Sequence, residues 1–122
     1  MTKLRRECLA VDLKDDPEVI ASYRHWHRPG GPPVEVTRSL RAAGIAALDI
    51  YLLGNRLFMV IDFTPDYSPG AKAAADADDP HVQAWNALMD GLQQELPFAR
   101  RDSASGKWRP LEHIYSLADQ PT

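Results

Sequence analysis

Cysteine is almost absent from this chain. Cys8 is the only cysteine among 122 residues, so no internal disulfide can form. Its place in an alternating apolar segment favours a buried, inert thiol over a nucleophile. No apolar run approaches the roughly 20 residues that a bilayer-spanning helix needs, and residues 1–6 lack the apolar stretch of a secretory signal. We therefore expect a cytoplasmic protein.

Concentrated positive charge is also lacking. The chain has 14 basic and 17 acidic residues, a formal net charge of -3, and its basic residues form nothing larger than pairs such as Arg5-Arg6 and Arg100-Arg101. This distribution argues against nucleic acid or an anionic membrane as a partner. Small neutral ligands and other proteins remain.

A metal site is not indicated. His25 and His27 form a His-x-His, and His81 and His113 are the two other histidines. Residues two apart on a helix point in different directions, and no cysteine or acidic ligand pattern accompanies them. We therefore predict no metal. The sequence leaves open whether His113 lies near a ligand pocket or on the surface of a sheet.

The composition that is present is typical of one globular domain. Hydrophobic residues make up 44% of the chain and charged residues 25%, which suits a single core built from residues 1–122. Neither an internal repeat nor a composition shift divides the chain. We predict one domain.

The first half of the chain alternates between strand and helix signals. Residues 7–13 have strand alternation, and Asp16 followed by Pro17 predicts a helix that runs to about residue 26. A second helix is predicted over residues 34–43, with Gly44 in the position of a left-handed cap.

The second half begins with a hairpin. Residues 45–53 and 56–63 are rich in strand formers, and Gly54-Asn55 between them supplies residues suited to positive φ in a tight turn. Residues 64–80 hold three prolines and predict a long connector, or a flap over a site, with a short helix around residues 71–77.

A helical stripe follows from Pro80, and Pro97 ends it. Residues 108–117 then alternate as a final strand. The apolar members of the stripe are Val82, Trp85, Leu88, Met89, Leu92 and Leu96.

This order predicts an α+β protein with the ferredoxin-like split βαβ pattern. In that pattern a four-stranded antiparallel sheet carries its helices on one face only. An antiparallel sheet with one uncovered apolar face commonly packs against a second copy, so we expect a homodimer with its sheets apposed.

Tyr23 and His27 form the most suggestive pair in the sequence. They lie four residues apart on the first predicted helix, so they share a face where the Pro/Gly-rich residues 28–33 open a loop. Histidine titrates near neutrality and can give or take a proton, and a neighbouring tyrosine can orient a hydroxylated substrate. By spacing alone the pair could also arise by chance, and Trp85 could be an ordinary core tryptophan.

Several segments together resemble the L-rhamnose mutarotase family, and within it the branch assigned to L-fucose. The similarity runs from about residue 8 to residue 117 with order and spacing in register. The segments that carry it are residues 8–17 (CLAVDLKDDP), Tyr23-x-x-x-His27, residues 43–45 (AGI), residues 50–59 (IYLLGNRLFM), residues 82–89 (VQxWxxLM), and Lys107-Trp108 before LExI at residues 111–114.

The resemblance implies a dimeric α+β barrel that interconverts the α and β anomers of a 6-deoxyhexose without metal or organic cofactor. It implies that His27 is the acid/base catalyst, that Tyr23 binds the sugar, and that Trp85 stacks on it. The residue types suit the reaction, because mutarotation needs only proton transfer to and from the hemiacetal oxygens. An indole also offers a flat surface to the apolar face of a hexopyranose.

Two positions differ from the family pattern. The Trp-Pro pair that usually follows the histidine is absent from residues 28–33, and Trp26 is the nearest tryptophan that could replace it. Leu48 stands where the rhamnose enzymes place a substrate-contacting tyrosine, which favours L-fucose over L-rhamnose. Asp49 and Tyr51 have the opposite strand parity from Leu48 and should point to the other face.

Two other kinds of protein remain possible from sequence. One is a different cofactor-free dimeric α+β barrel enzyme, such as a small monooxygenase or a lactone isomerase. The other is a non-catalytic ligand-binding or regulatory module on the same fold.

Overall fold

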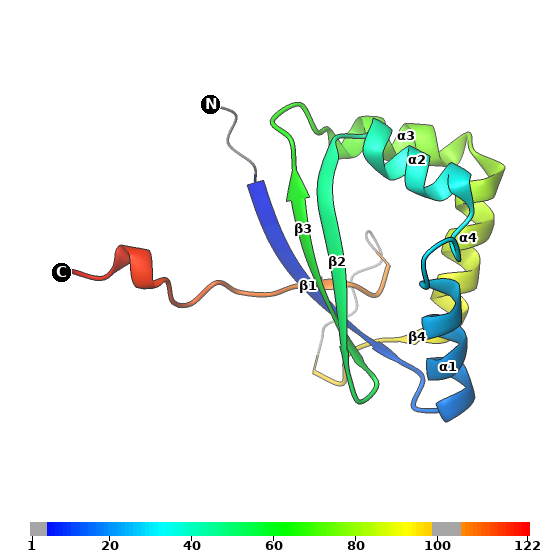
Figure 1. Cartoon of the computed structure of the whole chain (residues 1–122), viewed down its shortest axis with the longest axis horizontal. Coiled ribbons are helices and arrows are strands. Elements are labelled where there is room, and N and C mark those ends of the chain that lie inside the picture. The colour runs from blue at the N-terminus through cyan, green and yellow to red at the C-terminus, as the bar shows by residue number, and fades with distance from the viewer. Residues whose placement is uncertain (1–4, 99–105) are drawn as a thin grey trace.

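The computed structural model describes residues 5–98 and 106–122 and shows an antiparallel sheet at its centre (Figure 1). Its long strands are β1 (Arg5–Leu13), β2 (Ile45–Leu53) and β3 (Arg56–Phe63), in the order β2-β3-β1. Two short strands, β4 (Gln93–Gln94) and β5 (Arg109–Pro110), pair with the outer edge of β1. The predicted antiparallel sheet is therefore confirmed, with a fifth, very short strand.

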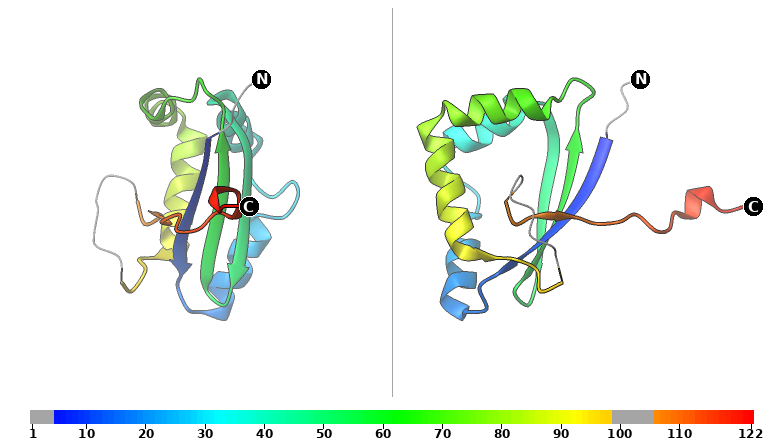
Figure 2. Two further views of the ribbon diagram at one scale, coloured as in Figure 1. Left: turned by 90° about the vertical axis from the view of Figure 1, so that its left-hand side faces the viewer. Right: turned by 180° about the vertical axis from the view of Figure 1, so that it is seen from behind.

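The α-helices of the described residues lie on one side of this sheet (Figures 1 and 2). This arrangement confirms the predicted α+β fold with helices on a single face. No helix in residues 5–98 or 106–122 is long and apolar enough to cross a membrane. The helices are α1 (Pro17–Trp26), α2 (Val34–Ala42), α3 (Pro69–Ala77) and α4 (Pro80–Leu92).

Three of the helices begin at a polar residue followed by proline. The side chain of Asp16 accepts a hydrogen bond from the Glu18 N–H at 2.8 Å, and Ser68 and Asp79 cap α3 and α4 in the same way. Proline fits the first helical position because its missing N–H would have no partner there, and each cap contributes about 1 kcal/mol. The connector between β3 and α4 therefore contains a full helix, which begins at Pro69 rather than near residue 71.

The hairpin between β2 and β3 forms with the predicted two-residue turn, because Leu53 pairs with Arg56. Gly54 has a φ of +62°, but Asn55 has a negative φ, so only one of the two turn residues uses the left-handed region. Asn55 instead ties the hairpin to β1. Its Nδ2 donates to the Leu13 carbonyl at 2.9 Å, and its own carbonyl accepts from the Leu13 N–H at 2.7 Å.

The core between sheet and helices has two parts. One contains Ile45, Ile61 and Phe63, near the start of β2. The other joins β1, β3, α1 and α4 and carries the candidate site at its margin. Its buried members are Val11, Leu13, Tyr23, Leu57 and Met89.

Helix α4 ends earlier than its apolar stripe predicts. It stops at Leu92, and Gln93 and Gln94 pair with Leu13 and Asp12 of β1. Leu96 is still buried, but on an extended segment rather than on the helix. The apolar stripe therefore predicted that Leu96 is buried, but not where the helix ends. The end of α4 is set by the pairing of Gln93 and Gln94 with the edge of β1.

The predicted final strand over residues 108–117 is wrong in length. Only Arg109 and Pro110 form β5, and one further bond joins the Leu111 N–H to the Cys8 carbonyl at 2.8 Å. Continuing that register would place Glu112 opposite Glu7, and like charges directly opposite each other destabilise a sheet. The chain leaves the sheet instead.

Residues 111–122, called here the C-terminal arm, extend away from the body on the side opposite the helices (Figures 1 and 2). The arm has one short 3-10 turn, Leu117–Asp119. Its apolar side chains are unusually exposed, with Ile114 at 83% and Leu117 at 77%. Apolar side chains that remain in contact with water contribute no hydrophobic stabilisation to a monomer.

Candidate active site

The last turn of α1 places Tyr23 and His27 in direct contact. Their rings are stacked, with centroids 3.9 Å apart and planes inclined by 21°. The i, i+4 spacing on a helix produces this contact, as the sequence predicted. Helix α1 ends at Trp26, so His27 stands at its C-terminal cap, where the Pro/Gly-rich loop begins.

The orientation of the His27 ring is set by the main chain. Its Nδ1 lies 2.7 Å from the Tyr23 carbonyl oxygen. A carbonyl can only accept, so Nδ1 carries the hydrogen and donates it, and Nε2 of the neutral ring is left as a proton acceptor. Burial lowers the pKa of His27, although the bond to the Tyr23 carbonyl partly opposes this. The imidazole is therefore neutral at pH 7, with a defined basic nitrogen.

Tyr23 is the most buried member of the site, with 4% of its surface exposed. Burial raises the pKa of its phenol well above the ordinary value. The hydroxyl thus keeps its proton at neutral pH and can donate or accept a hydrogen bond without becoming charged.

Trp85 joins this pair from α4. Its ring centroid lies 5.3 Å from that of His27, with the planes tilted by 60°. Trp26 meets Trp85 edge-on, with centroids 6.1 Å apart, but is not among the residues that line the cavity described next. Trp26 therefore supports Trp85 and does not replace the missing rim tryptophan.

These side chains border a cavity of about 960 Å³ between the sheet and the helices. Tyr23, His27 and Trp85 all line it, so the structure brings together the three residues that the sequence singled out. The sheet contributes an apolar wall that includes Leu48. Polar lining residues include Thr37, Gln83, Asn86, Asp90, Gln93 and Lys107.

Other candidates from the sequence lie elsewhere. Tyr51 is 60% exposed, and neither it nor Asp49 lines the cavity, as their strand parity predicted. His113 is exposed at the start of the C-terminal arm, away from the cavity lining. His81 lies 3.9 Å from Glu35 on the surface. Within the described residues, no three His, Cys, Asp or Glu side chains gather as a metal site would require.

Sequence reasoning missed one wall of the cavity. Lys107 and Trp108 line it from a segment about 80 residues beyond His27, together with Asp90 of α4. The adjacent pair Lys107-Trp108 was visible as a family-like motif, but nothing local assigned it to the site. Its position depends on the pairing of β5 with β1.

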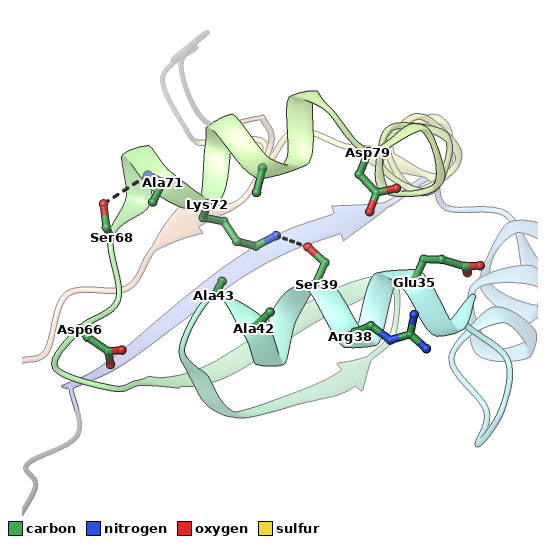
Figure 3. Close-up of a pocket in the computed structure, with 11 residues that line it drawn as sticks. Glu35, Arg38, Ser39, Ala42, Ala43, Asp66, Ser68, Ala71, Lys72 and Asp79 are labelled. Atoms are coloured by element: carbon green, nitrogen blue, oxygen red, sulfur yellow. Dashed lines mark hydrogen bonds between the residues drawn. The ribbon is translucent and has the colours of Figure 1, made fainter.

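A second hollow of about 500 Å³ lies between α2 and α3 (Figure 3). Lys72 reaches from α3 across it, with its Nζ 3.4 Å from Ser39 Oγ and 2.6 Å from Asp76 Oδ1. Ser39 and Lys72 border both hollows and so divide them. The lining of this second hollow contains no histidine, so it offers no group suited to proton transfer near neutrality.

The fold and the larger cavity together define a class of protein: an α+β protein with a half-buried imidazole and a half-buried indole facing a space for a small polar molecule. Comparison with known proteins gives the family. The family model for L-rhamnose mutarotase matches residues 6–117. The chain belongs to the L-rhamnose mutarotase family and is an isomerase that acts on sugar anomers.

Individual relatives agree with this assignment. The chain is 47% identical over 117 residues to an L-fucose mutarotase of Xanthomonas campestris pv. campestris, covering 95% of this chain and 90% of the relative. It is 29% identical over 109 residues to a UPF0734 protein of Dictyostelium discoideum, covering 88% and 86%.

A solved structure shows the same fold. The crystal structure of an L-rhamnose mutarotase from Formosa agariphila superposes with a TM-score of 0.60 at 19% identity, covering 93% of this chain and 98% of that one. Membership of the family favours the mutarotase interpretation over the monooxygenase, the lactone isomerase and the non-catalytic module that the sequence had left open.

Proposed function

We propose that this protein interconverts the α and β anomers of L-fucose, in preference to L-rhamnose, with His27 as the acid/base catalyst. The observation that carries the proposal is the neutral His27 ring, fixed through Nδ1 and set between Tyr23 and Trp85 at a cavity. The 47% identity to an L-fucose mutarotase over nearly the whole chain supports the choice of sugar.

The reaction uses the imidazole twice. Nε2 takes the proton of the anomeric hydroxyl while a water molecule gives a proton to the ring oxygen, the C1–O5 bond breaks, and C1 becomes an aldehyde. The bond between C1 and C2 then rotates, and O5 attacks the other face of the carbonyl. His27 returns its proton to the anomeric oxygen as O5 gives its proton back to water, so no proton is gained or lost overall. General acid/base assistance of this kind contributes about 10²–10⁴-fold in rate.

Tyr23 and Trp85 hold the sugar for this exchange. Because its burial keeps the phenol protonated, Tyr23 acts by hydrogen-bonding a sugar hydroxyl and not as a phenolate base. Trp85 offers its indole to the apolar C–H face and the C6 methyl group. Proton transfer to and from the hemiacetal oxygens is chemistry that side chains can supply by themselves.

The cavity wall supports a preference for L-fucose. Leu48 lines the cavity, and its side chain cannot hydrogen-bond a sugar hydroxyl. A sugar that relies on a hydroxyl contact at this position therefore binds less tightly than one that does not.

The expected homodimer is also part of the proposal. The sheet face opposite the helices is covered by no helix of the described residues, and it exposes Tyr51 and Leu53. The C-terminal arm leaves the body on this same side with exposed apolar residues. A second copy would bury both features at once. The cytoplasmic location expected from the sequence likewise remains a prediction.

NMR exchange spectroscopy on the anomeric protons of L-fucose and L-rhamnose tests the function. We expect the wild type to speed the exchange of both sugars, L-fucose more strongly. We expect His27→Ala to lose about 10²-fold or more of that acceleration, as removal of an acid/base group does. No acceleration by the wild type with either sugar would reject the proposal. Full activity of His27→Ala would reject only the assignment of the catalyst.

A further inference from the structure

The segment at residues 106–108 closes the cavity from a different direction than the helices do. Trp108 is half-buried and packs against the core cluster of Val11, Leu13, Tyr23, Leu57 and Met89, which Trp85 also contacts. Both tryptophans line the cavity that contains His27. Two indoles therefore face one cavity from separate elements.

Lys107 attaches this segment to α4, the helix that carries Trp85. Its Nζ lies 2.5 Å from Asp90 Oδ1 and 3.3 Å from the Asp90 carbonyl oxygen. Asp90 lies in the last turn of α4, where its carbonyl also accepts the N–H of the cap residue Gln93 and where a positive charge is favoured. The ammonium contacts both the carboxylate and the carbonyl of Asp90, which fixes Lys107, the residue that precedes Trp108.

We propose that Trp108 is a second sugar-contacting indole and that Lys107 is the residue that positions it. This inference rests on the proposed sugar mutarotase activity of the same cavity. A pyranose has two faces and an edge with a methyl group, and one indole covers only part of that surface. Trp108 is half-buried and lines the cavity, so part of its ring surface stays available to a ligand there, whereas the equally half-buried Trp26 does not line the cavity.

The indole N–H signals provide a direct test on the unmodified protein. The chain has three tryptophans, so a ¹⁵N-labelled sample gives three indole signals, assigned with Trp26→Phe, Trp85→Phe and Trp108→Phe. In a titration of the wild type with L-fucose, we expect the Trp85 and Trp108 signals to move along one saturating curve. A Trp108 signal that stays still while that of Trp85 moves would overturn the proposal.

Steady-state anomer exchange tests the same point through rates. We expect Trp108→Ala to raise KM for L-fucose about tenfold and to leave kcat within about twofold, because a lost contact that is equal in ground and transition states changes KM alone. An unchanged KM in a folded Trp108→Ala protein would overturn the proposal. If that variant does not fold, Trp108→Phe and the wild-type titration still decide.

Lys107 is tested by its own variants. We expect Lys107→Met to raise KM about threefold with kcat preserved and to shift the Trp108 indole signal in the free protein, and Lys107→Arg to restore both, because Arg keeps the charge at the helix end. Lys14→Met is the matched control, since Lys14 is exposed and outside the cavity lining, and it should change neither quantity. Equal behaviour of Lys107→Met and Lys14→Met would remove Lys107 from the proposal. Absence of anomer exchange by the wild type would instead reject the underlying function.

Discussion

Two effects of opposite sign set the pKa of the His27 imidazole. Burial lowers its pKa, and the bond from Nδ1 to the Tyr23 carbonyl partly restores it. The sequence predicts this residue, because an i, i+4 pair at a helix end can be recognised from spacing. It does not predict the tautomer, which depends on the position of the Tyr23 carbonyl oxygen in the last turn of α1.

The pH profile of the enzyme should reflect the lowered pKa of His27. We expect kcat/KM for L-fucose to be level from pH 7 to 8 and to fall only below the ordinary histidine value of about 6.5, because protonation removes the base. The same shift stabilises the fold above pH 6.5, and that contribution is lost as pH falls through the lowered pKa. A ¹⁵N titration of His27 should give the same midpoint as kcat/KM after the uncatalysed rate is subtracted. A midpoint above 6.5 would contradict a His27 pKa that partial burial lowers.

Leu48 should control the choice between sugars. We expect Leu48→Tyr to raise kcat/KM for L-rhamnose relative to L-fucose by about fivefold, since a hydroxyl placed at this wall adds one hydrogen bond worth about 1 kcal/mol. Val34→Tyr is the control, because Val34 is exposed and lies outside the cavity lining. The ratio of anomer exchange rates for the two sugars measures the effect. An unchanged ratio in Leu48→Tyr would mean that residue 48 does not contribute to the discrimination between the two sugars.

At the level of elements, the structure departs from the sequence at the end of α4 and at the end of the last strand. The stripe of α4 extends to Leu96, yet Gln93 and Gln94 pair with β1 and end the helix at Leu92. Strand alternation likewise extends to Leu117, yet β5 ends at Pro110. The periodicity of a segment predicts which of its side chains are buried. Which residues pair with the edge of β1 becomes clear only once the sheet is assembled. The wall made by Lys107 and Trp108 escaped prediction for the same reason.

Three glycines should respond differently to alanine, and urea unfolding can measure the differences. At Gly44 the φ is +98° and an added Cβ would lie 2.6 Å from Thr64 Oγ1, so we expect Gly44→Ala to cost about 2–4 kcal/mol. At Gly54 the φ is +62° with open space around, so the conformational cost of about 1–2 kcal/mol acts alone. Gly91 lies within α4 without a positive φ or a near contact, and alanine there should stabilise by up to about 1 kcal/mol. The reverse order would show that the α2–β2 junction is not tightly packed.

In the whole molecule, helices cover one face of the sheet and leave the other face without helices. On the helix-free side the sheet carries two fork-like ion pairs between β1 and β3. Arg6 bonds Asp62 at 2.8 and 3.0 Å, and Arg56 bonds Asp12 at 2.8 and 3.2 Å. The exposed Tyr51 and Leu53 of this face suit a surface that another protein covers.

Sedimentation of the full chain should report a dimer, with twice the 13.6 kDa mass of one chain. We expect the double variant Ile114→Glu, Leu117→Glu to shift the protein toward monomer, because two charges would have to be buried with the C-terminal arm. Ala73→Glu with Ala74→Glu is the matched control, since it adds the same charge on exposed positions of α3. A wild type that sediments at 13.6 kDa at working concentration would contradict the dimer.

The bond that orients the His27 imidazole ends on the main-chain carbonyl of Tyr23 and not on a side chain. No substitution at residue 23 can delete a main-chain oxygen, so this orientation is protected against point mutation as long as the last turn of α1 stays wound. The walls of the cavity have no such protection. On the proposed mechanism, single substitutions at positions such as Leu48 can therefore alter substrate preference while the main-chain bond that orients the His27 imidazole is kept.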